Sequence, residues 1–485
     1  MFDNKIVGDR LNDNLLGTEE ADRLLGIIGN DFIVGKQGND ILLGGLGEDT
    51  LNGTNPNSPH PGRGEIDTLK GAKDADLFVL GDAANIYYSG SQANDYALIT
   101  DFDASDTIQL KGTATDYVLR ENIEVQGYSG TAIVTADEEL IGFISNSQNL
   151  SLDSDRFSYI DLPDFDKMYV FSDSLSDPGN IFKATKSVQL FDIFGTDIPV
   201  TPSSPPYYQG RFSNGFVWVE RLATELEIDL IPSTDLSVIF PGLNINSPFN
   251  FSFSDGFGLI VNSDFNGRTT EESVNFAFGG AQTGEVGSGE FGDLIPGIKQ
   301  QVEWFVEDHR EADKTADADA LYIISGGRND YSDDDPNPED IINNIESEIE
   351  SLYEIGARDF LVSNLPDLGK IPATPAELTD TFSGYTQTHN ELLEQTTEEL
   401  RDELTGANIV ILNFNTLFDE ILENPQDYDL TNVSDPYLDP ISLEPTVGAS
   451  VDEYLFYDTV HPTATVHDIV NDFTLNTLAT EFATV

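Results

Sequence analysis

Two segments far apart in the chain carry side chains that together could perform nucleophilic catalysis. Ser174 lies in the Ser/Asp-rich segment 171–177, and Asp458 and His461 lie three residues apart near the C-terminus. A serine hydroxyl is a poor nucleophile until a base removes its proton, and that base needs a third group to fix its tautomer. The order Ser, Asp, His therefore predicts a hydrolase in which one loop supplies both partners of the serine.

Two intervening segments place glycine and asparagine where a developing oxyanion would need hydrogen-bond donors. Residues 275–281 read Asn-Phe-Ala-Phe-Gly-Gly-Ala, and residues 325–330 read Ser-Gly-Gly-Arg-Asn-Asp. Each residue alone has a structural explanation, because serine, glycine and asparagine are common in turns and caps. The agreement of four separated segments favours catalysis. The remaining histidines are interpreted as structural: His60, His309, His389 and His467.

Residues 165–485 resemble the GDSL (SGNH) family of esterases and lipases. The resemblance is carried by the segments around Ser174, Gly280, Asn329 and His461, and by Gln209-Gly-Arg-Phe-Ser-Asn-Gly215 before an expected helix at 217–226. It implies Ser174 as nucleophile, His461 as general base and Asp458 as the residue that orients it. It also implies an oxyanion hole built from the N–H groups of Ser174 and Gly280 and the side-chain amide of Asn329. Ser172 departs from the family, which usually has glycine two residues before the nucleophile.

The strands expected in this part are 167–171, 321–325, 359–363 and 408–412, separated by helical stretches at 298–308, 341–355 and 384–404. Alternating strands and helices predict a mostly parallel sheet covered on both faces, a three-layer α/β/α sandwich. The segment 189–272 exceeds a simple connection and includes the aromatic run Phe249-Asn-Phe-Ser-Phe253. We hypothesise that this insertion shapes or covers the acyl pocket.

A nine-residue repeat occupies the N-terminal part of the chain. Its units open at Gly8, Gly17, Gly26, Gly35 and Gly44, and the eighth position of each unit is leucine or isoleucine. The sixth position of each unit is aspartate: Asp13, Asp22, Asp31, Asp40 and Asp49. The pattern stops at 53–61 and resumes at Gly62 and Gly71. A fixed short period predicts a solenoid whose units bury their apolar residues only by stacking.

These units resemble the RTX nonapeptide, which implies a parallel β-roll with calcium in its turns. Glycines permit tight turns, and carbonyl and carboxylate oxygens are the hard ligands that Ca²⁺ prefers. By resemblance, the paired carboxylates are Asp13 with Asp31, Asp22 with Asp40, and Asp31 with Asp49. Leu11 and Glu20 stand where the first two units should have glycine. A glycine-rich solenoid without calcium is the alternative.

The sequence thus predicts three parts: a calcium-binding β-roll at 1–80, a β-rich cap of the roll at 81–160, and the hydrolase domain at 161–485. The 87 acidic against 23 basic residues give a formal net charge of −64, which makes nucleic acid an improbable partner. The acidity fits either a solvated surface or cation binding. The absence of cysteine excludes disulfides, thiolate catalysis and cysteine-type zinc sites.

The leading functional prediction is a serine ester hydrolase that acts through an acyl-enzyme on esters or lipids, with structural Ca²⁺ and no organic cofactor. The alternatives are acyl transfer to another acceptor, and a calcium-dependent adhesion or matrix protein with an inactive hydrolase-like domain. No cleavable signal is evident at Met1-Phe-Asp-Asn-Lys5, and no apolar stretch is long enough to span a membrane. Because cytosolic calcium is scarce, the repeat favours an extracellular protein exported without an N-terminal signal. The oligomeric state is not indicated.

Overall fold

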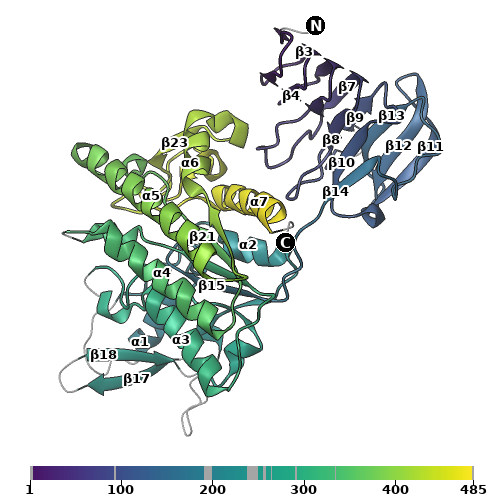
Figure 1. The fold of residues 1–485 in the computed structure, drawn as a ribbon. Coiled ribbons are helices and arrows are strands. Elements are labelled where there is room, and N and C mark those ends of the chain that lie inside the picture. The colour runs from purple at the N-terminus through teal and green to yellow at the C-terminus, as the bar shows by residue number, and fades with distance from the viewer. Residues whose placement is uncertain are drawn as a thin grey trace. The chain divides into compact units, whose positions relative to one another are not determined.

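The computed structural model describes residues 4–91, 94–190, 199–236, 249–254, 258–263, 265–289, 292–333 and 335–482. The chain separates into two compact units (Figure 1). The N-terminal unit comprises Met1–Pro163, Asp427–Asp429 and Leu475–Val485, and the α/β unit comprises Asp164–Gln426 and Leu430–Thr474.

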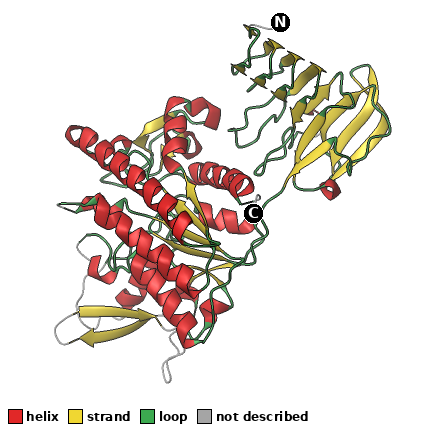
Figure 2. Cartoon of the chain, viewed as in Figure 1, coloured by secondary structure: helices red, strands yellow, loops and turns green. Residues whose placement is uncertain are grey.

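The N-terminal unit consists almost entirely of strands in two sheets (Figure 2). In order, the first sheet contains β1 (Asn4–Val7), β3 (Asp22–Ile28), β5 (Ile41–Leu46), β7 (Ile66–Lys73), β9 (Tyr96–Ile99), β13 (Leu140–Ser145), β12 (Tyr128–Thr135) and β11 (Tyr117–Val125). The second contains β14 (Phe157–Ile160), β10 (Thr107–Lys111), β8 (Leu77–Val79), β6 (Thr50–Asn52), β4 (Phe32–Val34) and β2 (Asn14–Leu16).

Successive repeat units alternate between these two sheets, so neighbouring strands in one sheet lie two units apart. Leu24 of β3 is in register with Leu42 of β5, and Ile33 of β4 with Leu51 of β6. All four side chains are fully buried. The apolar eighth position of the repeat therefore builds the core, as the periodicity predicted.

The strands at 81–160, expected as a β-rich cap of the roll, begin by continuing both sheets. Ile99 of β9 pairs in parallel register with Leu69, and Ile108 of β10 pairs with Phe78. Ile99 and Ile108 are both buried and extend the stack of apolar side chains between the sheets, although the glycine turns have ended. Among the described strands of the N-terminal unit, the antiparallel pairs are β11 with β12 and β12 with β13. The boundary after residue 80 stays a prediction.

The α/β unit contains a six-stranded sheet in which every pair is parallel. Its order is β16 (Leu230–Pro232), β19 (Ser273–Asn275), β15 (Met168–Ser172), β20 (Leu321–Ser325), β21 (Asp359–Ser363) and β22 (Asn408–Leu412). The four strands predicted from the sequence are present, each within one residue of its expected bounds. The short strands β16 and β19 were not predicted.

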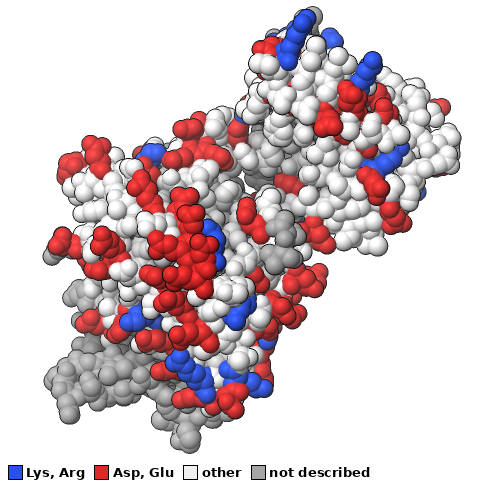
Figure 3. All heavy atoms as spheres, in the orientation of Figure 1, with Lys and Arg blue, Asp and Glu red and all other residues white. Residues whose placement is uncertain are grey.

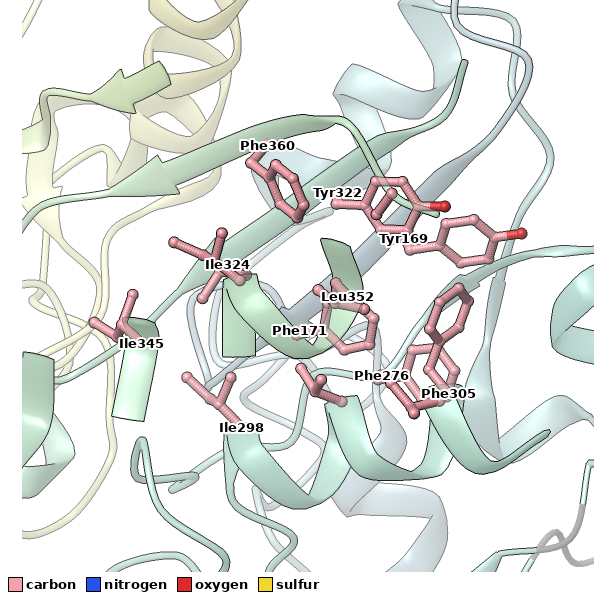
Figure 4. Packing of buried hydrophobic residues seen from close by; sticks show 14 of the residues in the cluster. Tyr169, Phe171, Phe276, Ile298, Phe305, Tyr322, Ile324, Ile345, Leu352 and Phe360 are labelled. Carbon is pink, nitrogen blue, oxygen red and sulfur yellow. The ribbon is translucent and has the colours of Figure 1, made fainter. Parts of the chain in front are cut away.

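In the described part of the chain, five helices lie between these strands: α1 (Asn180–Leu190), α2 (Trp218–Glu225), α3 (Ile298–Glu311), α4 (Pro338–Ile355) and α5 (Thr379–Glu403). Two more follow β22, namely α6 (Phe414–Glu423) and α7 (Ala464–Glu481). The helices α3 and α4 pack against strand residues such as Phe171, Tyr322 and Phe360, with Phe305 among the aromatic rings at the centre (Figure 4). This apolar contact holds β15 and β20 in place. The pair β23 (Asn432–Pro436) and β24 (Tyr454–Phe456) leads into the segment that carries Asp458 and His461.

The aromatic run Phe249 to Phe253 lies in β17 (Phe249–Ser254), which pairs antiparallel with β18 (Gly258–Ser263). Its side chains lie outside the described part of the chain, so the acyl-pocket hypothesis stays a prediction. Among the charged side chains on the visible face of the α/β unit, acidic ones predominate over basic ones (Figure 3). Within the described residues, none of the helices has both the length and the hydropathy that a membrane span requires.

Candidate active site and calcium-binding turns

The proposed nucleophile lies directly after the central strand β15. In a parallel sheet the carboxyl ends of the strands share one edge, where ligands usually bind. Ser172 ends β15 in extended conformation, so this position does not require glycine. The side chain of Gln301 on α3 accepts a hydrogen bond from Ser172 N–H at 2.9 Å and donates one to Ser172 O at 3.0 Å. The serine that departs from the family is therefore accommodated.

The structure brings together the three residues that the sequence singled out. His461 Nε2 lies 2.9 Å from Ser174 Oγ, and His461 Nδ1 lies 2.8 Å from Asp458 Oδ2. Asp458 Oδ1 also accepts hydrogen bonds from the backbone N–H groups of Val460 and His461, each at 2.8 Å. The short spacing thus lets the carboxylate fix its own loop as well as the imidazole. This arrangement can transfer a proton from the serine hydroxyl to Nε2.

Two aromatic residues that the sequence analysis did not assign to the site contact this pair. The Tyr207 hydroxyl donates a hydrogen bond of 2.6 Å to Asp458 Oδ2, and the Phe212 ring lies 4.8 Å from the imidazole of His461, centroid to centroid. Burial opposes ionisation of Asp458, but His461 and Tyr207 together hold its pKa well below the usual range. Asp458 is therefore ionised in the folded protein at neutral pH. The only sequence signal was that both aromatic residues lie in or beside the 209–215 segment.

Two backbone N–H groups beside Ser174 are available to an oxyanion. Within the described residues, neither Ser174 N–H nor Gly280 N–H has a hydrogen-bond acceptor. Gly280 has a φ of +87°, which other residues rarely adopt, so glycine is required for this turn. Two free donors next to a serine match the chemistry of oxyanion stabilisation.

Asp177 joins the nucleophile turn to the turn that carries Gly280. Its Oδ1 accepts hydrogen bonds from the N–H groups at the start of α1, including Gly179 N–H at 2.8 Å, and its Oδ2 accepts one from Gly279 N–H at 2.8 Å. Asn275 adds a second link, because its amide donates to Ser176 O at 2.8 Å. The two turns are thus held as one rigid piece.

The third predicted oxyanion donor, Asn329, lies at the same edge after β20 but is already engaged. Its Nδ2 donates to Ala281 O at 2.9 Å and to Asp173 Oδ2 at 3.3 Å. The longer bond, to Asp173, is the weaker one. An oxyanion would have to share or replace that bond.

His389 on α5 lies beneath the loop that carries Asn329. Its Nδ1 is 3.1 Å from the Tyr331 hydroxyl, and a side chain added at Gly327 would lie 2.9 Å from its ring. Burial lowers the pKa of His389 to about 4, so the folded protein holds it neutral. The histidine thus supports the loop as a neutral ring.

Acidification should therefore destabilise the α/β unit through His389. Because the unfolded histidine titrates near pH 6.5, its stabilising contribution is complete above pH 6.5 and is lost as the pH falls toward 4. Relative to His389→Gln, the wild type should lose about 3 kcal/mol of unfolding free energy between these pH values. Urea unfolding followed by tryptophan fluorescence measures this difference, because both tryptophans lie in the α/β unit. The control His60→Gln, at an exposed position, should show the same pH dependence of the unfolding free energy as the wild type. The same pH dependence in His389→Gln would contradict the prediction.

The aspartates of the repeat form a ladder between units. The N–H groups of Asp13, Asp22 and Asp31 donate to Oδ1 of the aspartate two units later, at 2.7–2.9 Å. The residues involved are those the sequence paired: Asp13 with Asp31, Asp22 with Asp40, and Asp31 with Asp49. The ladder continues from Asp40 to Asp67 and from Asp49 to Asp76.

The second oxygen of these carboxylates is available for a cation. Oδ2 of Asp31, Asp40 and Asp49, and Oδ1 of Asp22, are buried without a hydrogen-bond partner in the described residues. The turn leaves no room for a side chain at Gly26, since a Cβ there would lie 2.1 Å from Asp31 Oδ2 and 2.7 Å from Gly44 O. Burial raises the pKa of Asp40 to about 8 and that of Asp49 to about 6. Buried carboxylate and carbonyl oxygens without partners fit a hard cation such as Ca²⁺.

Asp13 is the weakest of the five predicted ligands. It is only partly buried, and its Oδ2 already accepts a hydrogen bond of 2.7 Å from Asp9 N–H. Asp22 is buried but its Oδ2 accepts from the Thr18 N–H and hydroxyl. These two belong to the units in which Leu11 and Glu20 replace glycine.

Comparison with known proteins gives matches to both units. A family model described as GDSL-like lipase/acylhydrolase matches residues 168–473. A model described as RTX calcium-binding nonapeptide repeat matches residues 7–42 and 25–55.

Three curated relatives match at low identity. A phosphatidylcholine-sterol acyltransferase of Aeromonas hydrophila is 26% identical over 56% of this chain and 64% of its own. A thermolabile hemolysin of Vibrio parahaemolyticus is 23% identical over 63% of this chain and 62% of its own. The secreted effector protein SseJ of Salmonella typhimurium is 26% identical over 64% of this chain and 62% of its own. The match thus spans less than two thirds of each relative.

Proposed function

The chain belongs to the GDSL-like lipase/acylhydrolase family, and on that premise we propose that it is a serine ester hydrolase with Ser174 as its nucleophile. The observation that carries the proposal is the continuous contact from Ser174 Oγ through His461 to Asp458, at 2.9 and 2.8 Å. Such a contact is the geometric requirement for activating a hydroxyl.

In the proposed reaction, Ser174 Oγ attacks the ester carbonyl carbon while its proton passes to His461 Nε2. Asp458, ionised and bonded to Nδ1, stabilises the imidazolium that forms. The imidazolium then gives this proton to the departing alkoxide, and the acyl group remains on Ser174. A water molecule activated by the same imidazole attacks the acyl-enzyme and releases the acid.

The proposed oxyanion hole consists of the N–H groups of Ser174 and Gly280, which have no acceptor within the described residues, with Asn329 as the third donor. Asn329 contributes when its Nδ2 exchanges the 3.3 Å contact to Asp173 for the oxyanion. Such donors act mainly in the transition state, where the oxygen carries charge.

Hydrolysis of p-nitrophenyl esters of graded chain length, with calcium present, tests the proposal and defines the acyl preference. Adding an alcohol acceptor measures acyl transfer, the activity named for the Aeromonas relative. Product ester in excess of free acid would assign the chain as a transferase. The absence of turnover on every ester would favour the adhesion or matrix alternative.

We also propose that Asp22, Asp31, Asp40 and Asp49 hold Ca²⁺ in the turns of the repeat, with Asp13 as a weaker ligand. The ion would neutralise buried carboxylates and join units that are two repeats apart. Calcium-dependent folding favours an extracellular location, and two of the relatives are named as a hemolysin and a secreted effector. The parallel pairing of the repeat strands supports a β-roll, and the helices connecting a parallel sheet support a three-layer α/β/α hydrolase domain.

A further inference from the structure

Arg328 stands between the two residues that shape one side of the candidate active site, Gly327 and Asn329. Its side chain is partly buried, and within the described residues its guanidinium makes two hydrogen bonds, both long. Nη1 lies 3.5 Å from Asn329 Oδ1 and 3.5 Å from Ser332 Oγ. Both acceptors are neutral, and 3.5 Å is beyond the usual range of a hydrogen bond.

Other arginines of the α/β unit, the buried Arg211 among them, make much shorter hydrogen bonds. Arg211 donates to both carboxylate oxygens of Glu220 at 2.7 and 2.6 Å, and Arg401 donates to Ile409 O at 2.7 Å. Within the described residues, no carboxylate lies within 4 Å of the Arg328 guanidinium. The lack of a close carboxylate is unexpected in a chain with 87 acidic residues. Burial of a charge without a close partner is costly, so this arrangement calls for an explanation.

The charge of Arg328 acts on the catalytic residues. Burial lowers the pKa of Arg328, while the Asp173 and Asp458 carboxylates partly offset the effect. Asp173 precedes the nucleophile, and Asp458 belongs to the catalytic pair. The guanidinium is therefore a positive group close to the place where the ester binds, with its donors largely unused.

We propose that Arg328 recognises an anionic group carried by the ester substrate close to its scissile bond, a phosphate or a carboxylate. A guanidinium offers planar, paired donors that match the oxygens of both groups. The strong negative charge of the protein repels such substrates from the surface as a whole, so recognition requires a local cation. This inference rests on the proposed ester hydrolase function and specifies its substrate class.

The test compares pairs of water-soluble esters that differ in one charge. Butyrylglycerol phosphate and monobutyrylglycerol place the charge on the alcohol side, whereas p-nitrophenyl hydrogen glutarate and p-nitrophenyl valerate place it on the acyl side. The ratio of kcat/KM for the anionic to the neutral ester is measured for wild type, Arg328→Gln and Arg328→Lys. Because the ratio is the readout, any loss common to both esters cancels. Salt at about 0.5 M screens the long-range repulsion.

In at least one pair, Arg328→Gln should lower the ratio by about tenfold or more, and Arg328→Lys by less. The control Arg310→Gln, which removes an exposed positive charge at the end of α3, should keep the wild-type ratio. An unchanged ratio in both pairs overturns the inference and leaves the ester hydrolase proposal intact. Equal losses on both members of each pair also overturn it, because they indicate support of the oxyanion loop. Failure of the wild type to cleave any ester rejects the proposed function, and the inference falls with it.

Discussion

Replacement of Ser174 with alanine is expected to lower kcat for ester hydrolysis by a factor of about 10⁵ or more, without unfolding the protein. The reason is that Ser174 Oγ is the hydrogen-bond partner of His461 Nε2 in the described residues, and Nε2 is the atom that accepts the serine proton. Loss of the nucleophile leaves only the contribution of substrate binding and oxyanion donors. Hydrolysis of the best p-nitrophenyl ester measures the effect, and circular dichroism confirms the fold.

Ser176→Ala is the matched control, because it removes another buried hydroxyl from the same turn. Ser176 Oγ accepts a hydrogen bond of 2.9 Å from Ser172 Oγ and does not contact His461. Its loss should reduce stability by about 1 kcal/mol and change kcat by no more than a few-fold. Wild-type activity in Ser174→Ala, or an equally inactive Ser176→Ala, would refute the assigned nucleophile.

Removal of calcium is expected to destabilise the N-terminal unit while the α/β unit remains folded. In the absence of a cation, the unpartnered oxygens of Asp31, Asp40 and Asp49 stay buried at a cost. A site held at a calcium concentration 100 times its Kd contributes about 2.7 kcal/mol, and several sites act together. Chelation should therefore remove the strand signal in far-ultraviolet circular dichroism. Tryptophan emission should change little, because Trp218 and Trp304 both lie in the α/β unit.

Two comparisons make the calcium prediction specific. Magnesium should not restore the signal, because it demands a strict octahedral arrangement and gives up its water reluctantly. Asp40→Asn should raise the calcium concentration needed for refolding, whereas Glu124→Gln, on the exposed face of β11, should not. A chelated protein with unchanged circular dichroism would support the calcium-free solenoid instead.

The strands and helices around the candidate active site were predictable because their sequence signals are local. Met168 to Ser172 and Leu321 to Ser325 are short apolar runs, and they form the two central strands β15 and β20. The nine-residue period likewise located the buried positions of the N-terminal unit. Ser174, Asp458 and His461 stood out because residue type, order and spacing agreed.

The parts that were not predictable depend on contacts between distant segments. Tyr207 bonds to Asp458 across 251 positions, and Gln301 bonds to Ser172 across 129. No local pattern marks either residue. The strand β19 has only three residues, too few for a recognisable period. The continuation of the sheets through Ile99 and Ile108 could not be predicted, because these strands keep the register of the repeat after its glycine pattern has ended in the sequence.

The most direct measurement is the intact mass of the protein after reaction with an aryl alkylphosphonate ester, a reagent that traps an activated serine. One adduct per chain, mapped to the peptide that contains Ser174 and absent from His461→Ala, is the predicted result. It would establish that His461 activates this hydroxyl, independently of the natural ester. An unmodified wild type, or an adduct on a different residue, would contradict the assignment of Ser174 as the nucleophile.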